Sequence, residues 1–264
     1  MLLNNKDIGN QNIKEGVHIY TVDAVATISF AHPKHNCFPQ KQLEALTAAI
    51  DSCAQEDRVH VVLLQSDPTK AFCAGASFDE LLAVKTPQQG KRFFMGFANL
   101  INAMRLCAKP IVGRIHGKAI GGGVGIVAAC DYAIATTTAA VRLSELAIGI
   151  GPFVIAPAVA RKTGAAALAS MALQPKEWKS ADWALSKGLY AEVHSDFETA
   201  NSAAIDLAKQ LANYAPDAVA ELNKTLWANT DHWATLLPDN AETSGRLLLL
   251  PETQGTLKKL KPNT

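Results

Sequence analysis

The hydrophobic and polar positions of the chain change their spacing along its length. Apolar and polar residues alternate over residues 17–23, and an apolar run over residues 24–30 follows almost at once. This pattern predicts an antiparallel pair of strands. Residues 40–52 place their apolar side chains at helical spacing and predict a helix. Residues 59–65 are almost continuously apolar, which is typical of a strand covered on both faces.

The middle of the chain alternates between helical and strand patterns. Ser77 and Glu80 have the spacing of a capping box, which predicts a helix beginning at Phe78. Residues 88–106 carry an apolar face at helical spacing, and residues 111–115 form a short apolar run after a proline. Three consecutive glycines and an alanine-rich apolar segment then predict a buried helix.

After residue 131 the pattern becomes mostly helical. Strands are predicted at residues 132–136, 141–142 and 191–194. Helices are predicted at residues 154–162, 165–173, 180–187, 197–214 and 216–227, and from about residue 244 onward. Alternating strands and helices followed by helices alone predict an α/β core with a helical C-terminal region.

Composition narrows the class of protein. The 264 residues are 48% hydrophobic with a net charge of +1, which fits a globular core and gives no reason to expect nucleic acid or a membrane as a partner. The five cysteines show no paired spacing, which favours free thiols in a reducing compartment. Residues 1–11 lack an apolar targeting core, and the glycine-containing apolar run 119–130 is too short to span a bilayer. A cytoplasmic protein is therefore expected.

The glycines at positions 121–123 and 125 have several interpretations. Close packing of a helix against a strand explains many glycine clusters. A dinucleotide-binding fingerprint, with Glu145 on the ribose, is disfavoured because Ile126 occupies the place of the third glycine. A phosphate-binding P-loop is excluded because no Gly-Lys-Ser/Thr sequence follows. The remaining interpretation is a backbone N–H directed at a carbonyl oxygen.

A second turn supplies a partner for such a donor. An oxyanion hole needs two converging N–H groups, and Ala74, Gly75 and Ala76 form another turn of small residues before a predicted helix. Neither turn needs a reactive side chain for this task. Together the two turns favour a site that binds a carbonyl oxygen.

The motifs also resemble those of a known family. Residues 71–76 (AFCAGA), then 120–123 (IGGG), then Ser144-Glu145 with Gly149 four residues on, are similar in order and spacing to the crotonase superfamily, the enoyl-CoA hydratases and isomerases. The resemblance extends over nearly the whole chain. It implies an α/β spiral of repeated ββα units over residues 1–200 and a helical trimerisation region over residues 201–264. It also implies a homo-oligomer, a trimer or hexamer.

The resemblance further implies an acyl-CoA thioester as substrate, with coenzyme A as part of that substrate and with no separate cofactor or metal. Carried over by position, the N–H groups of Ala74 and Gly122 hold the thioester oxygen. The substrate-binding residues then include Gly75, Ala76, Ser77, Gly121 and Lys34. Among other cationic groups, Lys70, Lys258, Lys259 and Lys261 are candidates for the CoA phosphates.

The chain departs from the family at the acid–base residues. Hydratases of the family carry two glutamates, of which Glu145 matches the second, whereas Gly125 stands at the first. Moving a double bond needs only one base, so the resemblance favours Δ3-to-Δ2 enoyl-CoA isomerisation with Glu145 as the catalytic residue. The alternatives are an enoyl-CoA hydratase (lyase), another reaction of the family, or a non-catalytic acyl-CoA-binding subunit.

Other reactive side chains have plainer interpretations. Ser77 replaces an aspartate that many members carry, and serves equally well as a helix cap. Cys73 is a candidate nucleophile, but no histidine lies near it in sequence and a buried thiol is the commoner case. His116 is expected to pack at a strand end. The apolar residues of the C-terminal region, such as Trp227, Trp233, Leu236, Leu237 and 247–250, favour an oligomer interface.

Overall fold

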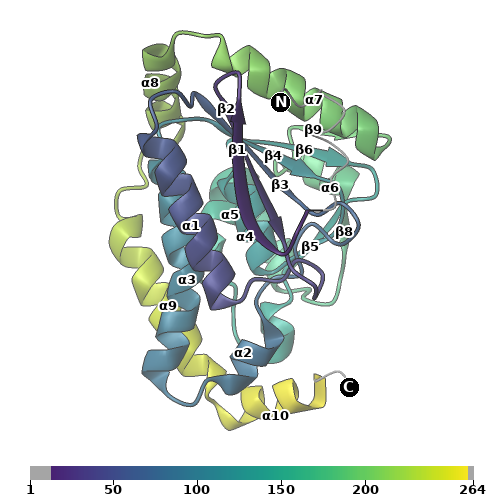
Figure 1. The fold of residues 1–264 in the computed structure, drawn as a ribbon. Coiled ribbons are helices and arrows are strands. Elements are labelled where there is room, and N and C mark those ends of the chain that lie inside the picture. The colour runs from purple at the N-terminus through teal and green to yellow at the C-terminus, as the bar shows by residue number, and fades with distance from the viewer. Residues whose placement is uncertain (1–12, 261–264) are drawn as a thin grey trace.

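A computed structural model describes residues 13–260, so the predictions for residues 1–11 and for Lys261 lie outside the described part. A six-stranded sheet in the order β1-β2-β3-β4-β6-β9 forms its centre (Figure 1). Its strands are β1 (Gly16–Val22), β2 (Val25–Ala31), β3 (Val61–Ser66), β4 (Ile111–Ile115), β6 (Tyr132–Thr136) and β9 (Glu192–His194).

The first two strands form the predicted hairpin. Gly16 pairs with Ala31 and Val22 with Val25, so the turn consists of two residues. Asp23 and Ala24 both have positive φ, of 50° and 62°, which is the geometry of the tight turns that match strand twist. The remaining strands pair in parallel, and every residue of β3 is buried, as its continuous apolar run predicts.

Helices cover both faces of this sheet. They are α1 (Gln40–Gln55), α2 (Phe78–Ala83), α3 (Pro87–Leu106), α4 (Gly122–Ala129), α5 (Ala156–Ala172), α6 (Ala181–Ser186), α7 (Phe197–Ala212), α8 (Pro216–Leu226), α9 (Trp233–Leu248) and α10 (Pro251–Leu260). Val62 and Leu64 point to a core shared with α1, α3 and α4. Val61 and Leu63 point to the opposite face, where four alanines of α7 cover them. The predicted boundary at residue 200 therefore falls inside a helix that packs on the sheet.

A second, three-stranded sheet lies beside the first. It consists of β5 (Ala119–Ile120), β7 (Ala140–Arg142) and β8 (Lys179–Ser180), with β7 in the middle. β5 and β7 run parallel, whereas β8 is antiparallel to β7. The segments next to β5 and β7 carry the glycines and Glu145, so this small sheet sets the position of the candidate site.

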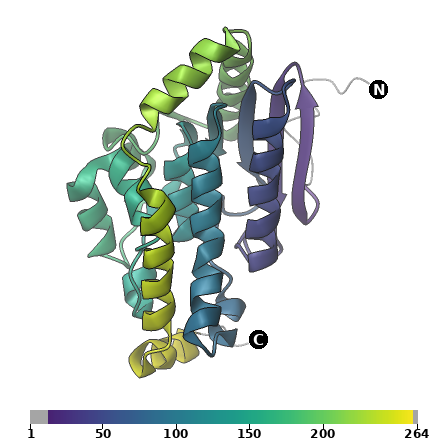
Figure 2. The ribbon, with the colours of Figure 1, turned by 90° about the vertical axis from the view of Figure 1, so that its left-hand side faces the viewer.

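The C-terminal region differs from the prediction at one helix. α9 begins at Trp233 and contains Pro238, whereas the sequence pattern predicted a helix only from about residue 244. The missing N–H of a proline costs one helical hydrogen bond, and α9 compensates by packing along α3, beside which it lies in Figure 2. Trp227, Trp233 and Leu237 are buried within the chain by this packing. These side chains therefore give no evidence for an oligomer, which stays a prediction.

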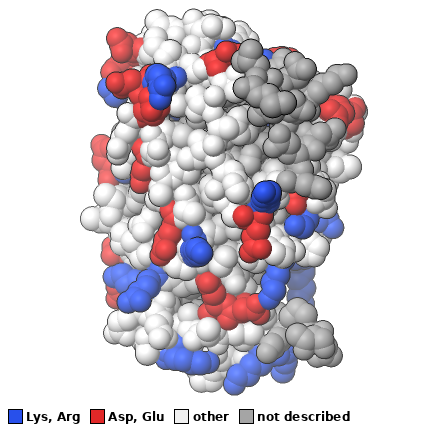
Figure 3. Space-filling model, viewed as in Figure 1, with Lys and Arg blue, Asp and Glu red and all other residues white. Residues whose placement is uncertain are grey.

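The distribution of charged side chains on the surface and the polarity of the helices agree with the amino-acid composition. Acidic and basic side chains are interspersed on the face shown in Figure 3, as expected for a net charge of +1. None of the helices within residues 13–260 is long and apolar enough to cross a bilayer.

Candidate functional site

Two turns far apart in sequence lie side by side. The Cys73 N–H donates to the Lys118 carbonyl (3.1 Å), and the Ile120 N–H donates to the Cys73 carbonyl (3.0 Å). Gly75 has φ +82°, and a Cβ there would lie 2.7 Å from the Ile120 carbonyl oxygen. Only glycine combines this conformation with so close an approach. The sequence brings the Ala74–Gly75–Ala76 turn against the glycine stretch in this way.

The N–H groups of the Ala74–Gly75–Ala76 turn differ in whether they already have an acceptor within the protein. The Ala74 N–H donates to the His35 carbonyl (3.1 Å), so this predicted donor is already used inside the protein. On either side of Ala76, the Phe38 N–H donates to the Gly75 carbonyl (2.7 Å) and the Ser77 N–H donates to the Phe38 carbonyl (3.0 Å). The N–H of Ala76 has no acceptor among residues 13–260. Ala76 therefore presents the free donor of this turn.

The second turn opens onto α4. Gly121 has φ +52°, and its N–H donates to the Arg142 carbonyl (2.9 Å). Gly122 is the first residue of α4, where the N–H has no partner in the preceding turn of the helix. A Cβ added to Gly75 would lie 3.8 Å from the Gly122 nitrogen, which shows how near the two turns are. Within residues 13–260 no acceptor is found for the Gly122 N–H, which is therefore a second free donor close to the first.

Glu145 lies directly beside these donors. It begins a short 3₁₀ helix, η1 (Glu145–Ile148), which follows β7. A Cβ added to Gly121 would lie 2.8 Å from Glu145 Oε1, so the glycine leaves room for the carboxylate. Glu145 Oε2 is shielded from solvent and has no hydrogen-bond partner in the described part of the chain. Burial raises the pKa of Glu145 to about 7, against a smaller opposing effect of its own backbone N–H.

A cavity of about 600 Å³ opens at this point. Ala74, Gly75, Ala76, Gly121, Gly122 and Glu145 all line it. The other lining residues are mainly apolar and come chiefly from α2, α3, η1, the loop before α5, and α10. Among the described residues that line it, Glu145 is the sole carboxylate, whereas Arg142, Lys176 and Lys259 carry positive charge. A cavity with apolar walls, two free N–H groups and one carboxylate suits a substrate that carries a carbonyl group.

The surroundings of Gly125 leave no room for a polar side chain at this position. A Cβ added there would lie 2.4 Å from Ile155 Cγ2 and 2.6 Å from Ile155 Cβ. Ile155 is buried and also lines the cavity. An apolar side chain therefore fills the space that a longer residue at position 125 would need. No second carboxylate stands beside Glu145 among the residues that the structure describes.

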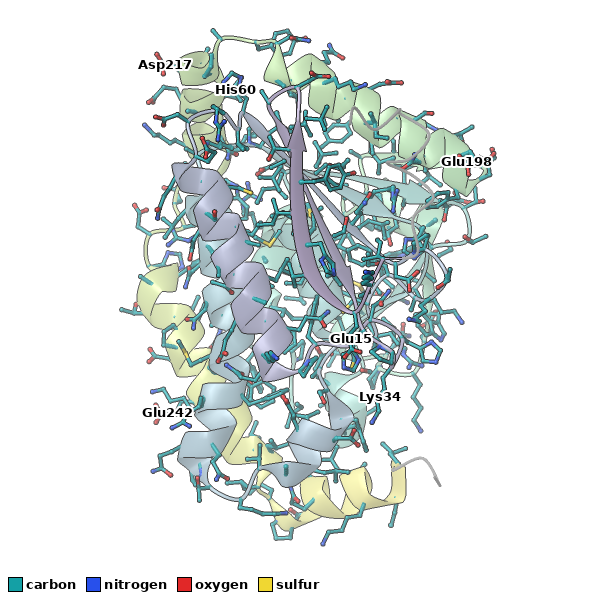
Figure 4. The ribbon with its side chains drawn as sticks, viewed as in Figure 1. Glu15, Lys34, His60, Glu198, Asp217 and Glu242 are labelled. Atoms are coloured by element: carbon teal, nitrogen blue, oxygen red, sulfur yellow. The ribbon has the colours of Figure 1, made fainter. Side chains whose placement is uncertain are left out.

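Two predicted binding residues lie outside the cavity wall. Ser77 accepts a hydrogen bond from the Glu80 N–H (3.5 Å) and caps α2, as its sequence spacing predicts. Lys34 is at the surface (Figure 4), and its ammonium group forms an ion pair with Asp79. The structure thus places six of the eight predicted site residues on the cavity and these two behind or outside it.

The other reactive candidates are structural. Cys73 is fully buried, and this burial raises the pKa of its thiol far above the usual range. His116 lies at the end of β4, where one ring nitrogen contacts the Lys70 carbonyl oxygen (3.0 Å). Burial lowers the pKa of His116 to about 4. Neither side chain lines the cavity.

Three of the lining residues that the sequence did not predict bear on the chemistry of the site. Ile155 lies against Gly125, Phe97 lies against Gly122, and Arg142 adds a positive charge. Arg142 carried one signal, since a charged residue ends a short apolar strand three positions before Glu145. The Gly125–Ile155 and Gly122–Phe97 contacts join residues 30 and 25 positions apart, and the local pattern gives no sign of them.

Comparison with known proteins agrees with this geometry. The sequence model of the family described as "Enoyl-CoA hydratase/isomerase" matches residues 21–242. A "Probable enoyl-CoA hydratase" of Bacillus subtilis is 28% identical over 206 residues, which cover 78% of this chain and 79% of that protein. The human mitochondrial "Delta(3,5)-Delta(2,4)-dienoyl-CoA isomerase" is 29% identical over 137 residues, or 52% of this chain and 42% of that protein.

A solved structure shows the same fold. The Legionella pneumophila protein provisionally named as an enoyl-CoA hydratase/isomerase (crotonase) superposes with a TM-score of 0.77 and 28% sequence identity, over 83% of this chain and 85% of that one. The predicted crotonase-like α/β fold is confirmed. Because the family model covers most of the sequence, the chain belongs to the enoyl-CoA hydratase/isomerase family of the crotonase superfamily.

Proposed function

We propose that the protein moves a double bond in an acyl-CoA thioester, from the Δ3 to the Δ2 position, with Glu145 as its single acid–base group. One observation carries this proposal: the carboxylate of Glu145, whose Oε2 is shielded from solvent, lies beside two free backbone donors, while Ile155 fills the space where a second carboxylate would stand. In this reaction one group removes a proton from C2 and returns a proton to C4. A lone carboxylate is sufficient for both steps.

The backbone donors stabilise the intermediate. Removal of the C2 proton places negative charge on the thioester oxygen, and donors fixed in advance in a dry site stabilise such charge by about 3–4 kcal/mol each. We place this oxygen between the N–H groups of Ala76 and Gly122. The resemblance to the family favours Ala74 for the first position, but the Ala74 N–H is bonded to the His35 carbonyl.

Two other functions are kept as alternatives. Hydration of a 2-enoyl-CoA by Glu145 alone is supported by the similarity to the probable enoyl-CoA hydratase of Bacillus subtilis. A non-catalytic acyl-CoA-binding subunit would use the same cavity without turnover. Cytoplasmic localisation and assembly into a trimer or hexamer stay predictions from the sequence.

A product assay separates these functions. The protein is incubated with 3-enoyl-CoA and with 2-enoyl-CoA of matched chain lengths, and the products are identified by mass spectrometry and chromatography. We expect 3-enoyl-CoA to be converted to 2-enoyl-CoA with little 3-hydroxyacyl-CoA. Efficient hydration without movement of a double bond would make the protein a hydratase. Binding without turnover of either substrate would leave the subunit role.

The assignment of the donors predicts a difference between two alanines. With ¹⁵N-labelled alanine and glycine, addition of an acyl-CoA should move the amide proton signals of Ala76 and Gly122 downfield. The Ala74 signal should change little because its N–H is already bonded to His35. This measurement needs no substitution, which matters because a Cβ at Gly122 would lie 2.1 Å from the Phe97 ring. A shift at Ala74 without one at Ala76 would restore the original assignment.

The raised pKa of Glu145 predicts a pH dependence. The base must be ionised in order to accept the C2 proton, so kcat/KM should rise with pH and level off above an apparent pKa near 7. Below that value kcat/KM should fall about tenfold per pH unit. A profile that is flat between about pH 5 and pH 8 would contradict Glu145 as the base.

A further inference from the structure

We infer that Arg142 binds a carboxylate group on the acyl part of the substrate, so that the cavity selects CoA thioesters of dicarboxylic acids. This inference rests on the proposed function, because it takes the thioester to lie at Gly122. The observation behind it is a juxtaposition: Arg142, whose side-chain Nε has no hydrogen-bond partner in the described part of the chain, lines the same cavity as Glu145 and the two free N–H donors.

The guanidinium of Arg142 is available for a ligand. It forms no ion pair with any residue in the range 13–260, and its Nε is shielded from solvent without a hydrogen-bond partner there. An arginine has five N–H donors in a planar fork, which matches the two oxygens of a carboxylate. A buried donor without an acceptor costs free energy, so an anion at this position would supply the acceptor that Arg142 Nε lacks.

Neighbouring residues hold the side chain in place. The Arg142 guanidinium carbon lies 4.5 Å from the centre of the Trp178 ring. Arg142 is the last residue of β7, and Trp178 directly precedes β8, which pairs with β7, so the small sheet brings the two residues together. The Lys118 ammonium lies 4.9 Å from the same ring. Stacking on an indole orients a guanidinium while leaving its edge free for hydrogen bonds.

The position of Arg142 selects the acyl group over the CoA phosphates. Its carbonyl accepts the Gly121 N–H, so its backbone adjoins the donor proposed for the thioester oxygen. The phosphates of CoA are separated from the thioester by the whole pantetheine arm. Lys259 of α10 is another cation on the cavity and is free to serve that end of the ligand. A carboxylate carried by the acyl chain is the anion that reaches Arg142.

Calorimetric binding tests this inference without requiring turnover. The probes are saturated diacid mono-thioesters from malonyl-CoA to suberyl-CoA, each paired with the monoacid thioester of equal length from propionyl-CoA to octanoyl-CoA. We expect the wild type to prefer the diacid at one or two lengths. Arg142→Gln should weaken that diacid by about 10- to 100-fold and the matched monoacid by less than about threefold.

Two further variants act as controls. Lys118→Gln removes a charge from the same Trp178 ring without altering the cavity wall, and should leave the diacid preference intact. Arg142→Lys keeps the charge but not the planar fork, so it should retain part of the preference for the diacid. This variant replaces Arg142→Gln in the test if Arg142→Gln does not fold.

Each outcome decides one point. Equal weakening of diacid, monoacid and free CoA by Arg142→Gln would mean that Arg142 binds a phosphate, and would overturn the inference. The absence of any diacid preference in the wild type would also overturn it. A diacid preference lost in Arg142→Gln, in a protein that moves no double bond, would uphold the carboxylate site and reject the proposed isomerisation.

Discussion

Replacing Glu145 by Gln is expected to lower turnover of 3-enoyl-CoA by about 10²- to 10⁴-fold while the affinity for acyl-CoA changes little. The amide has almost the same shape as the carboxylate but cannot accept the C2 proton. The backbone donors Ala76 and Gly122 do not depend on this side chain. Steady-state kinetics and calorimetry with a saturated acyl-CoA measure the two effects separately.

The same substitution should make the protein more stable above neutral pH. The folded-state pKa of Glu145, about 7, lies above the ordinary value of 4.5, so folding opposes its ionisation. The wild type therefore loses stability relative to Glu145→Gln as the pH rises from the unfolded-state pKa to the folded-state pKa, and the difference is constant above it. Thermal unfolding at about pH 5 and about pH 8 should show the gain mainly at the higher pH.

A surface glutamate provides the matched control. Glu177 is exposed and forms an ion pair with Lys179 (3.0 Å) beside the cavity-lining Lys176. Glu177→Gln makes the same chemical change outside the cavity, and should alter neither turnover nor its pH profile. Turnover of Glu145→Gln within about tenfold of the wild type would remove Glu145 from the reaction.

Local sequence patterns predicted the scaffold of this site well. The hairpin of β1 and β2, the buried strand β3, the cap at Ser77 and the helix after the glycines follow from side-chain periodicity and turn chemistry over a few residues. The position of Glu145 beside the glycines was suggested only by the resemblance to a family. Without it, a surface charge at a helix start was the simpler interpretation.

The finer features depend on contacts that periodicity does not encode. Whether Ala74 or Ala76 offers a free N–H is decided by the His35 carbonyl, which lies far back in the sequence. The start of α9 was missed because packing against α3 outweighs the local cost of Pro238. The apolar C-terminal residues suggested an interface, but several of them are buried inside the chain.

The contact between Gly125 and Ile155 changes how a second carboxylate can be introduced. Gly125→Glu alone should unfold or distort the site, because its Cβ would lie 2.6 Å from Ile155 Cβ. Ile155→Ala keeps that Cβ, so only Ile155→Gly removes the overlap. Ile155 is the N-cap of α5, a position at which glycine is tolerated. The informative variant is therefore the combination of Gly125→Glu with Ile155→Gly.

We expect this double variant to fold, at a cost of about 2–5 kcal/mol from the loss of the buried Ile155 side chain, and to gain hydration of 2-enoyl-CoA. A second carboxylate lets the site hold and polarise a water molecule, so the ratio of hydration to isomerisation should rise about tenfold or more. Gly125→Gln with Ile155→Gly is the control, because it has the same shape without the charge. Equal ratios in the two folded double variants would show that the missing carboxylate is not what withholds hydration, and the argument from a lone Glu145 would fail.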